Sequence, residues 1–159
     1  MRMTDAVLPG TPAFVIEAYE SLAERARVRD FGLIEEDVIV LDTETTGLSV
    51  RDNKLIEISA ARIRGREIVD TFDTFVHPGM PIPHEITQLT SITDADVAGA
   101  PAPEEAVASL ERFVGGSPVI AHNAAFDRSF IEAVKGGVRV SDIWIDSLAL
   151  SRIALPRLK

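Results

Sequence analysis

The sequence predicts one α/β domain built on a mixed sheet, with helices on both faces of the sheet. Three observations support this: a near-continuous apolar segment at Val38–Leu41, apolar segments on either side of Gly65, and alternating strand-like and helical segments after Pro103. An apolar run of this kind is typical of a strand buried on both faces. With 159 residues and 46% hydrophobic content, the chain can form one core of ordinary size.

An amphipathic helix is predicted ahead of this domain, over Pro12–Arg29. Thr11 followed by Pro12 is typical of a helix start, and apolar residues then recur at helical spacing. We therefore divide the chain into residues 1–36, a helical extension, and residues 37–159, the main domain.

The main domain begins with its antiparallel half. Residues 37–42 are predicted to form the first strand, and residues 55–64 and 67–76 a hairpin around Gly65. The proline-rich segment His77–Pro83 then ends this half of the sheet.

The second half alternates helices with short strands. A helix over Pro103–Val114 carries two glutamates in its first turn and is stopped by Gly115-Gly116. The following elements are a strand, a helix, a strand and a helix capped by Asp146, over residues 119–122, 124–135, 143–145 and 147–154. The predicted sheet therefore has five strands.

Composition excludes several classes of protein. A net charge of −9 and a pI near 4.8 argue against a broad basic surface for nucleic acid, although an enzyme that grips a few terminal nucleotides needs none. The chain has no cysteine, and its start, Met1–Val7, lacks the long apolar core of a signal peptide. No window approaches 18 apolar residues. We expect a cytoplasmic protein without a membrane segment.

Two carboxylates end the first strand. Alternate side chains of a strand share a face, so Asp42 and Glu44 are expected to point the same way, roughly 6 to 7 Å apart. Like charges so placed favour a cation between them, and hard oxygen ligands suit Mg²⁺ or Mn²⁺. An isolated Asp-x-Glu would more often cap a turn.

Asp127 is a third candidate ligand. It follows Asn123 into the first turn of a predicted helix, where the amide dipoles tolerate negative charge. Helix capping is the alternative for this carboxylate taken alone.

The segment Asp42–Leu48 resembles the first motif of the DEDD superfamily of 3′-to-5′ exonucleases, in its DnaQ-like group, which includes the proofreading epsilon subunit of bacterial DNA polymerase III and ribonuclease T. Matching segments follow in order, at residues 56–58, 77–83, 89–93 and 121–127. Ser91 departs from the family, which usually has glycine there. The resemblance covers roughly Val38 to Leu155 and implies a ribonuclease H-like fold.

The resemblance also implies a two-metal site of Mg²⁺ or Mn²⁺ for phosphodiester cleavage. Asp42 would bridge both ions, Glu44 would hold the ion that activates water, and Asp127 would serve the second ion. The residues implied to face the terminal nucleotide are Thr45, Thr46, Leu48, Asn123 and Phe126, with Leu48 near the base.

The third motif of the family, a histidine followed five positions later by aspartate, has no match in the sequence. No histidine follows His122, and Asp146 is better explained as a helix cap. We expect the C-terminal helices that carry this motif to be missing, and little or no activity from the 159 residues alone. Removing a general base typically costs on the order of 10² to 10⁴ in rate.

The leading hypothesis is therefore an exonuclease domain of the DNA-proofreading or repair type, acting on a single-stranded DNA or RNA 3′ end. Its partner would be a DNA polymerase or a C-terminal segment supplied elsewhere. A non-catalytic module that binds nucleotide or a partner is the alternative. A phosphatase with an aspartyl nucleophile is a third hypothesis, disfavoured because position 44 is glutamate rather than aspartate.

Overall fold

A computed structural model describes residues 12–14, 16–17, 36–134 and 139–154. The chain divides into two compact units, residues 1–36 and residues 37–159. In the first unit, residues 13–14 and 16–17 are helical and Pro12 is not, and residues 15 and 18–29 of the helix expected over Pro12–Arg29 lie outside the described residues. Within the described ranges, no helix has the length and hydropathy needed to cross a membrane.

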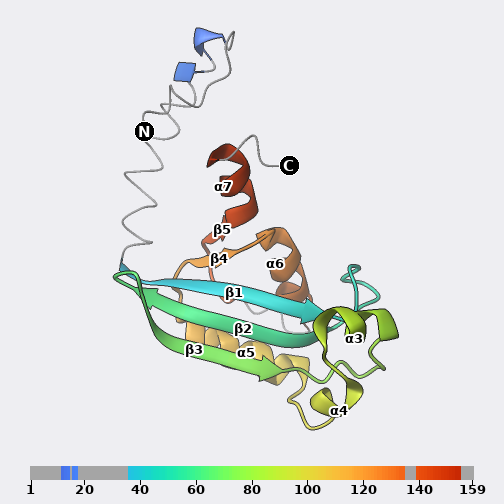
Figure 1. Ribbon diagram of the computed structural model, residues 1–159. Coiled ribbons are helices and arrows are strands. Elements are labelled where there is room, and N and C mark those ends of the chain that lie inside the picture. The colour runs from blue at the N-terminus through green and yellow to red at the C-terminus, as the bar shows by residue number, and fades with distance from the viewer. Residues whose placement is uncertain (1–11, 15, 18–35, 135–138, 155–159) are drawn as a thin grey trace. The chain divides into compact units, whose positions relative to one another are not determined.

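The second unit is built on a five-stranded mixed sheet in the order β3-β2-β1-β4-β5 (Figure 1). Its strands β1 to β5 are Val38–Thr45, Leu55–Arg64, Glu67–Phe75, Val119–Ala121 and Trp144–Asp146. The first three strands pair antiparallel, whereas β1 pairs parallel with β4, and β4 with β5. This confirms the mixed five-stranded sheet expected from the sequence.

In the described part of this unit, five helices follow or interrupt the strands: α3 to α7 are His84–Thr90, Asp94–Val97, Pro103–Val114, Ala124–Ala133 and Ser147–Ala154. Neither α3 nor α4 was expected from the sequence. The first has seven residues and buries none of them, and the second has four residues, so neither is long enough to show an amphipathic period. A capping box between Thr93 and Asp96 stabilises α4.

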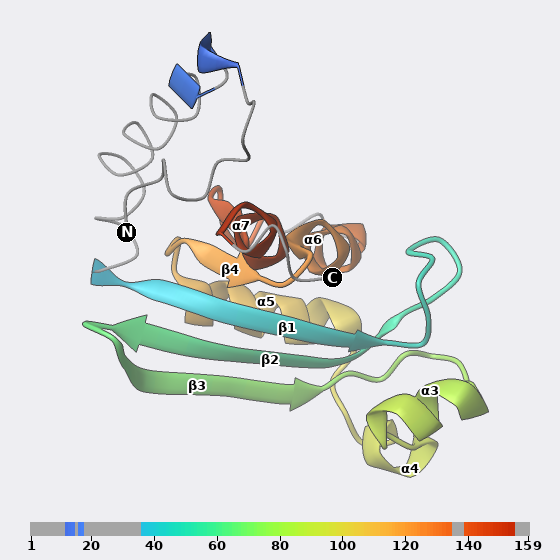
Figure 2. The same cartoon turned by 45° about the horizontal axis from the view of Figure 1, so that its top comes forward.

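One face of the sheet carries the main core. Helices α5 and α6 contribute to one buried cluster with alternate residues of β1, among them Ile39 and Leu41. Figure 2 shows α5 behind β1 and β2. The expectation that β1 is buried on both faces holds at its start, where Val38 and Ile39 are buried, and is wrong further along, because Val40 is 39% exposed and Asp42 is also exposed. Helices were expected on both faces of the sheet. Helices α5 and α6, which share the main core, both lie on the face that carries Ile39.

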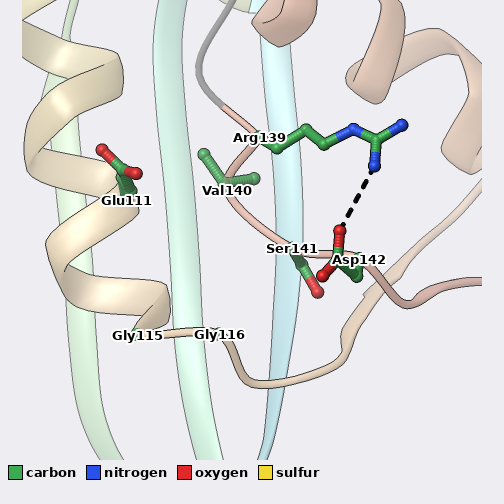
Figure 3. Close-up of a pocket in the computed structure, with 7 residues that line it drawn as sticks. All are labelled: Glu111, Gly115, Gly116, Arg139, Val140, Ser141 and Asp142. Atoms are coloured by element: carbon green, nitrogen blue, oxygen red, sulfur yellow. Dashed lines mark hydrogen bonds and ion pairs between the residues drawn. The ribbon is translucent and has the colours of Figure 1, made fainter.

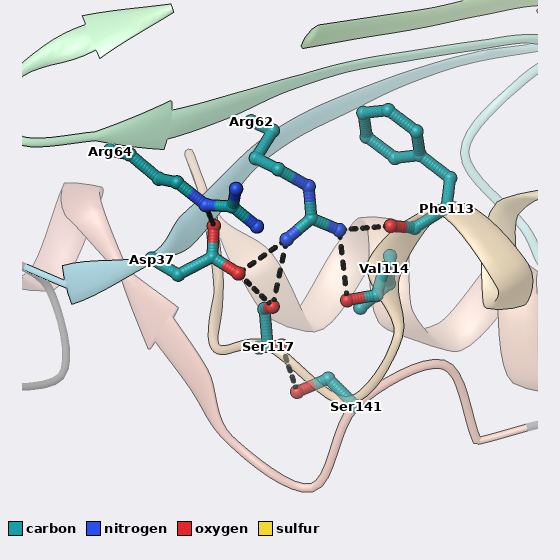
Figure 4. Close-up of polar contacts among 7 residues, drawn as sticks. All are labelled: Asp37, Arg62, Arg64, Phe113, Val114, Ser117 and Ser141. Carbon is teal, nitrogen blue, oxygen red and sulfur yellow. Dashed lines mark hydrogen bonds and ion pairs between the residues drawn. The ribbon is translucent and has the colours of Figure 1, made fainter. Parts of the chain in front are cut away.

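A polar network fastens the start of β1 to the end of α5 (Figure 4). The Arg62 guanidinium donates to Asp37, to Ser117 Oγ at 3.1 Å, and to the carbonyls of the last residues of α5, Phe113 and Val114. Ser117 Oγ donates to Asp37 at 2.7 Å. Burial acts to raise the pKa of Asp37, but hydrogen bonds and the nearby arginine charges hold it below its usual value. This network lies at the end of β1 opposite to Asp42.

Candidate active site

Asp42 and Glu44 lie on one face of β1 near its C-terminal end. The buried residues Leu41 and Thr43 alternate with them on the other face. Across the antiparallel pair with β2, Asp42 lies opposite Ser59 and Glu44 lies opposite Glu57. The strand geometry therefore places the two motif carboxylates side by side, as their spacing predicts.

The electrostatics of this face favour a cation. Burial raises the pKa of Glu44, and the charge of Asp42 raises it further. Burial likewise raises the pKa of Glu57, followed by the charges of Asp73, Glu44 and Asp42. Because neighbouring negative charges make Glu44 and Glu57 harder to ionise, a bound cation would relieve repulsion that the protein alone leaves in place.

Glu57 was not among the residues nominated from the sequence. A pattern in the sequence could have identified it, because it is an acid between Ile56 and Ile58, both fully buried in β2. An acid in such a strand must point to the face opposite its neighbours. That face is the one that carries Glu44.

Asp127 lies in the first turn of α6 and is only 2% exposed. Its Oδ1 accepts a hydrogen bond of 2.8 Å from Thr43 Oγ1. Burial raises the pKa of Asp127 to about 6; the hydrogen bond from Thr43 opposes this, and the charge of Asp42 adds to it. The carboxylate of Asp127 is therefore close enough to Asp42 to respond to its charge, while one of its oxygens is engaged by the strand between the two motif acids.

The carboxylates at the end of β1 supply some of the oxygen ligands that a hard divalent cation needs. Asp42 and Glu44 supply carboxylate oxygens on one face, which is what Mg²⁺ or Mn²⁺ prefers. Among the described residues, no group of three or more acidic or histidine side chains is assembled as a metal cluster. The structure thus brings Asp42 and Glu44 together, and it places Asp127 on Thr43 rather than in a three-acid cluster.

Thr45 and Thr46 are buried, and their hydroxyls form hydrogen bonds within the protein, that of Thr46 also donating to Met80 Sδ at 4.0 Å. Thr45 Oγ1 donates to the carbonyl of Gly47 at 2.7 Å. Thr46 Oγ1 accepts from the amide of Lys54 at 3.0 Å. These two threonines therefore shape the chain that follows β1, and Leu48, at 87% exposure, is the residue of the motif that this segment presents outward.

Asn123 and Phe126 flank the start of α6. Asn123 caps the helix in the left-handed conformation (φ 65°) and is exposed, and its amide donates to Asp146 Oδ1 at 3.0 Å. Phe126 packs against the main core with its ring centroid 5.0 Å from that of Phe130. The predicted capping role of Asp146 is confirmed, since Oδ1 also accepts from the amide of Leu148 at 2.9 Å.

A surface hollow lies away from these residues, between the end of α5 and residues 139–142 (Figure 3). Glu111 and the glycine pair 115–116 line one side, and Arg139 and Asp142 pair with each other at 3.4 Å on the other. None of the residues nominated from the sequence lines it.

Comparison with known proteins gives the family. Residues 39–136 match the family model named RNase T, whose description is "Exonuclease". The chain is 42% identical over 127 residues to the PolC-type DNA polymerase III of Clostridium perfringens, and these residues cover 79% of the chain and 9% of that relative. It is 46% identical over 121 residues to the corresponding protein of Caldanaerobacter subterraneus subsp. tengcongensis, covering 75% of the chain and 9% of the relative. The chain therefore spans about a tenth of the length of these relatives.

Solved structures share the fold. Exonuclease X in complex with 5′ overhanging duplex DNA superimposes with a TM-score of 0.62 and 28% identity, covering 77% of the chain and 66% of that structure. Exonuclease I without ligand gives a TM-score of 0.62 at 15% identity, over 77% of the chain and 32% of that structure. The second likeness concerns the fold alone.

Proposed function

Because the chain belongs to the RNase T exonuclease family, we propose that it is a metal-dependent 3′-to-5′ exonuclease domain that removes nucleoside monophosphates from a nucleic-acid 3′ end. The observation that carries this proposal is the placement of Asp42 and Glu44 on one face at the end of β1, with Asp127 close enough to respond to Asp42. The likeness to PolC-type polymerases supports a DNA-proofreading or repair role beside a polymerase in the cytoplasm.

The residues proposed to hold Mg²⁺ or Mn²⁺ are Asp42, Glu44 and Asp127. A divalent cation bound there would lower the pKa of a water molecule and balance the negative charge of the phosphodiester that is cleaved. The chain's own contribution is to hold Asp42 and Glu44 on a rigid strand, and to hold Asp127 by Thr43 at the start of α6. Asp127 would offer its second oxygen, because Oδ1 already accepts from Thr43.

The proposed substrate is the end of a single DNA or RNA strand rather than a long duplex. A net charge of −9 disfavours extended contact with phosphates, so the protein is expected to bind only a few nucleotides at the strand end. The DNA bound in the exonuclease X structure supports a nucleic-acid ligand for this fold. Leu48, Asn123 and Phe126 are proposed to face the terminal nucleotide, with Thr45 and Thr46 shaping the chain between Glu44 and Leu48.

A non-catalytic nucleotide-binding module is the second candidate. It is favoured by one observation, that the Asp127 carboxylate contacts Thr43 and joins no three-acid cluster among the described residues. Such a module would bind nucleotide without needing the two acids of β1.

One experiment separates the two candidates. Calorimetry measures thymidine 5′-monophosphate binding in Mn²⁺ to the chain and to Asp42→Asn, and a 5′-labelled single strand reports cleavage. The exonuclease proposal expects metal-dependent nucleotide binding that Asp42→Asn abolishes. Because the third motif has no match in the 159 residues, it expects shortening of the strand from its 3′ end only when a downstream segment that carries this motif is supplied. Equal nucleotide affinity in the variant, with an uncut strand, would establish the binding module instead.

A further inference from the structure

The segment that follows β1, residues 46–53, is here called the β1–β2 turn. Asn53 stabilises this turn by hydrogen bonds. Its side-chain Oδ1 accepts from the amide of Ser49 at 2.9 Å, and its Nδ2 donates to the carbonyl of Thr46 at 3.3 Å. Its own amide donates to the carbonyl of Ser49 at 2.8 Å. One side chain therefore joins both ends of the four-residue stretch Thr46–Ser49, which contains Leu48.

The carboxamide of Asn53 also packs on Gly47. A Cβ added at Gly47 would lie 2.8 Å from Cγ, Oδ1 and Nδ2 of Asn53 alike, so the plane of the amide covers the place where a side chain would start. Gly47 has φ of 153°, a conformation that glycine adopts far more readily than other residues. Glycine at 47 and asparagine at 53 thus fit each other both in backbone conformation and in space.

The result is an exposed apolar side chain on a fixed backbone. Leu48 lies between Gly47 and Ser49, both in contact with Asn53, and is 87% exposed. Thr46 adds paired backbone and side-chain hydrogen bonds to Lys54 at the base of the turn. Figures 1 and 2 show this turn at the C-terminal end of β1, the end that carries Glu44. A single exposed leucine is ordinary on a protein surface, but here five hydrogen bonds hold the turn that carries it.

We infer that Asn53 is a positioning residue for substrate: it holds the β1–β2 turn so that Leu48 contacts the base of the terminal nucleotide while Asp42 and Glu44 face its phosphate. The inference rests on the proposed exonuclease function. Its physical basis is preorganisation, since a loop already ordered before binding loses less conformational entropy when ligand arrives. Asn53 itself does not touch the nucleotide and acts through Leu48.

The test is a double-mutant cycle on nucleotide affinity. Calorimetry in Mn²⁺ gives the thymidine 5′-monophosphate dissociation constant for the wild type, Asn53→Ala, Leu48→Ala and the double variant. We expect Asn53→Ala to weaken affinity about tenfold in the wild type, on the scale of one or two net hydrogen bonds, and less than about twofold in the Leu48→Ala background, because coupled residues are not additive.

Two further variants and one ligand-free readout complete the design. Asn53→Asp keeps the shape and the acceptor for Ser49 but replaces the donor to the Thr46 carbonyl with an oxygen, so it should restore only part of the affinity. Asp52→Ala is the matched control, since Asp52 is exposed in the same turn and bonds Ser49 Oγ but neither Thr46 nor Gly47. Hydrogen exchange of the metal-free protein should speed up at the amides of residues 46–53 in Asn53→Ala and remain unchanged in Asp52→Ala.

The outcomes are separable. Unchanged exchange in Asn53→Ala, or additive effects of Asn53→Ala and Leu48→Ala, overturns the inference while the exonuclease proposal stands. Faster exchange with unaltered nucleotide affinity also overturns it, because Asn53 would then serve the turn alone. A wild-type chain that binds no nucleotide in Mn²⁺ and cuts no strand overturns the proposed function, and the inference with it.

Discussion

The hydroxyl of Thr43 donates a 2.8 Å hydrogen bond to Oδ1 of Asp127, joining residues 84 positions apart in the sequence. It connects the buried face of β1 to the first turn of α6. Since Thr43 lies between Asp42 and Glu44, the same three-residue segment presents two carboxylates on one face and holds a third from the other.

Replacing Thr43 with valine should destabilise the protein by about 1 to 3 kcal/mol, because the isosteric change leaves the buried carboxyl of Asp127 without its hydroxyl donor. Thr43→Ser keeps the donor and should cost less than half as much. Urea unfolding at pH 7 without metal measures both. Equal losses in the two variants would mean that the methyl group, and not the hydrogen bond, stabilises this contact.

Asp127→Asn should stabilise the metal-free protein at pH 7.5. The folded-state pKa of Asp127, about 6, lies above its ordinary value of 3.8, so the folded protein binds more protons than the unfolded chain between these values. The free energy of unfolding therefore falls as the pH rises from about 4 to 6, and the full penalty is present above pH 6.

The stabilisation should be on the order of 1 to 2 kcal/mol at pH 7.5, after allowance for solvent screening, and close to zero at pH 4. Urea unfolding across this pH range in a chelating buffer checks the prediction. A variant less stable than the wild type at pH 7.5 would show that the charged carboxylate is the form that the fold prefers.

Asp42→Asn should remove the response of stability to Mn²⁺. A ligand that binds only the folded state stabilises it by about 2.7 kcal/mol at a hundredfold excess over its dissociation constant, so the wild-type Tm should rise with Mn²⁺ concentration. The variant should lose that rise while its metal-free Tm stays equal or increases, because repulsion with Glu44 is gone. Differential scanning calorimetry measures both, with the exposed Asp52→Asn as control.

Arg62→Ala should cost about 3 to 5 kcal/mol of folding free energy. The arginine side chain is 13% exposed, and its loss leaves Asp37 without its buried partner and the α5 carbonyls of Phe113 and Val114 without a donor. Arg64→Ala is the matched control, since Arg64 also pairs with Asp37 but is 58% exposed, and should cost less than about 1 kcal/mol. Guanidinium unfolding compares them, and similar losses would contradict a special role for Arg62.

The long elements of the fold were predictable because their patterns are local. Helix α5 occupies the predicted residues, Pro103–Val114, since proline at its start and Gly115 after its end are read from adjacent positions. The hairpin around Gly65 likewise has strands close to those predicted. The exposure of Val40 was not predictable, because an apolar run does not tell which of its faces a helix will cover.

The candidate site was partly predictable for the same reason. Asp42 and Glu44 share a face because a strand has a period of two, whatever the rest of the fold does. The burial of Thr45 and Thr46, and the use of their hydroxyls within the β1–β2 turn, depend on the course of the chain to Lys54 and were not foreseen. Glu57 lies in the site because the pairing of β1 with β2 places it opposite Glu44.

By itself, the sequence determined the strand-end acids, the helix caps and the family resemblance, because these depend on neighbouring residues and on motifs that are contiguous in the chain. Only the tertiary structure decided that Asp127 reaches Thr43, that Glu57 lies beside Glu44, and that Asn53 covers Gly47. Contacts of this kind depend on pairing register and on the packing of distant segments, and the burial that shifts the pKa of Asp127 arises only when β1 and α6 come together.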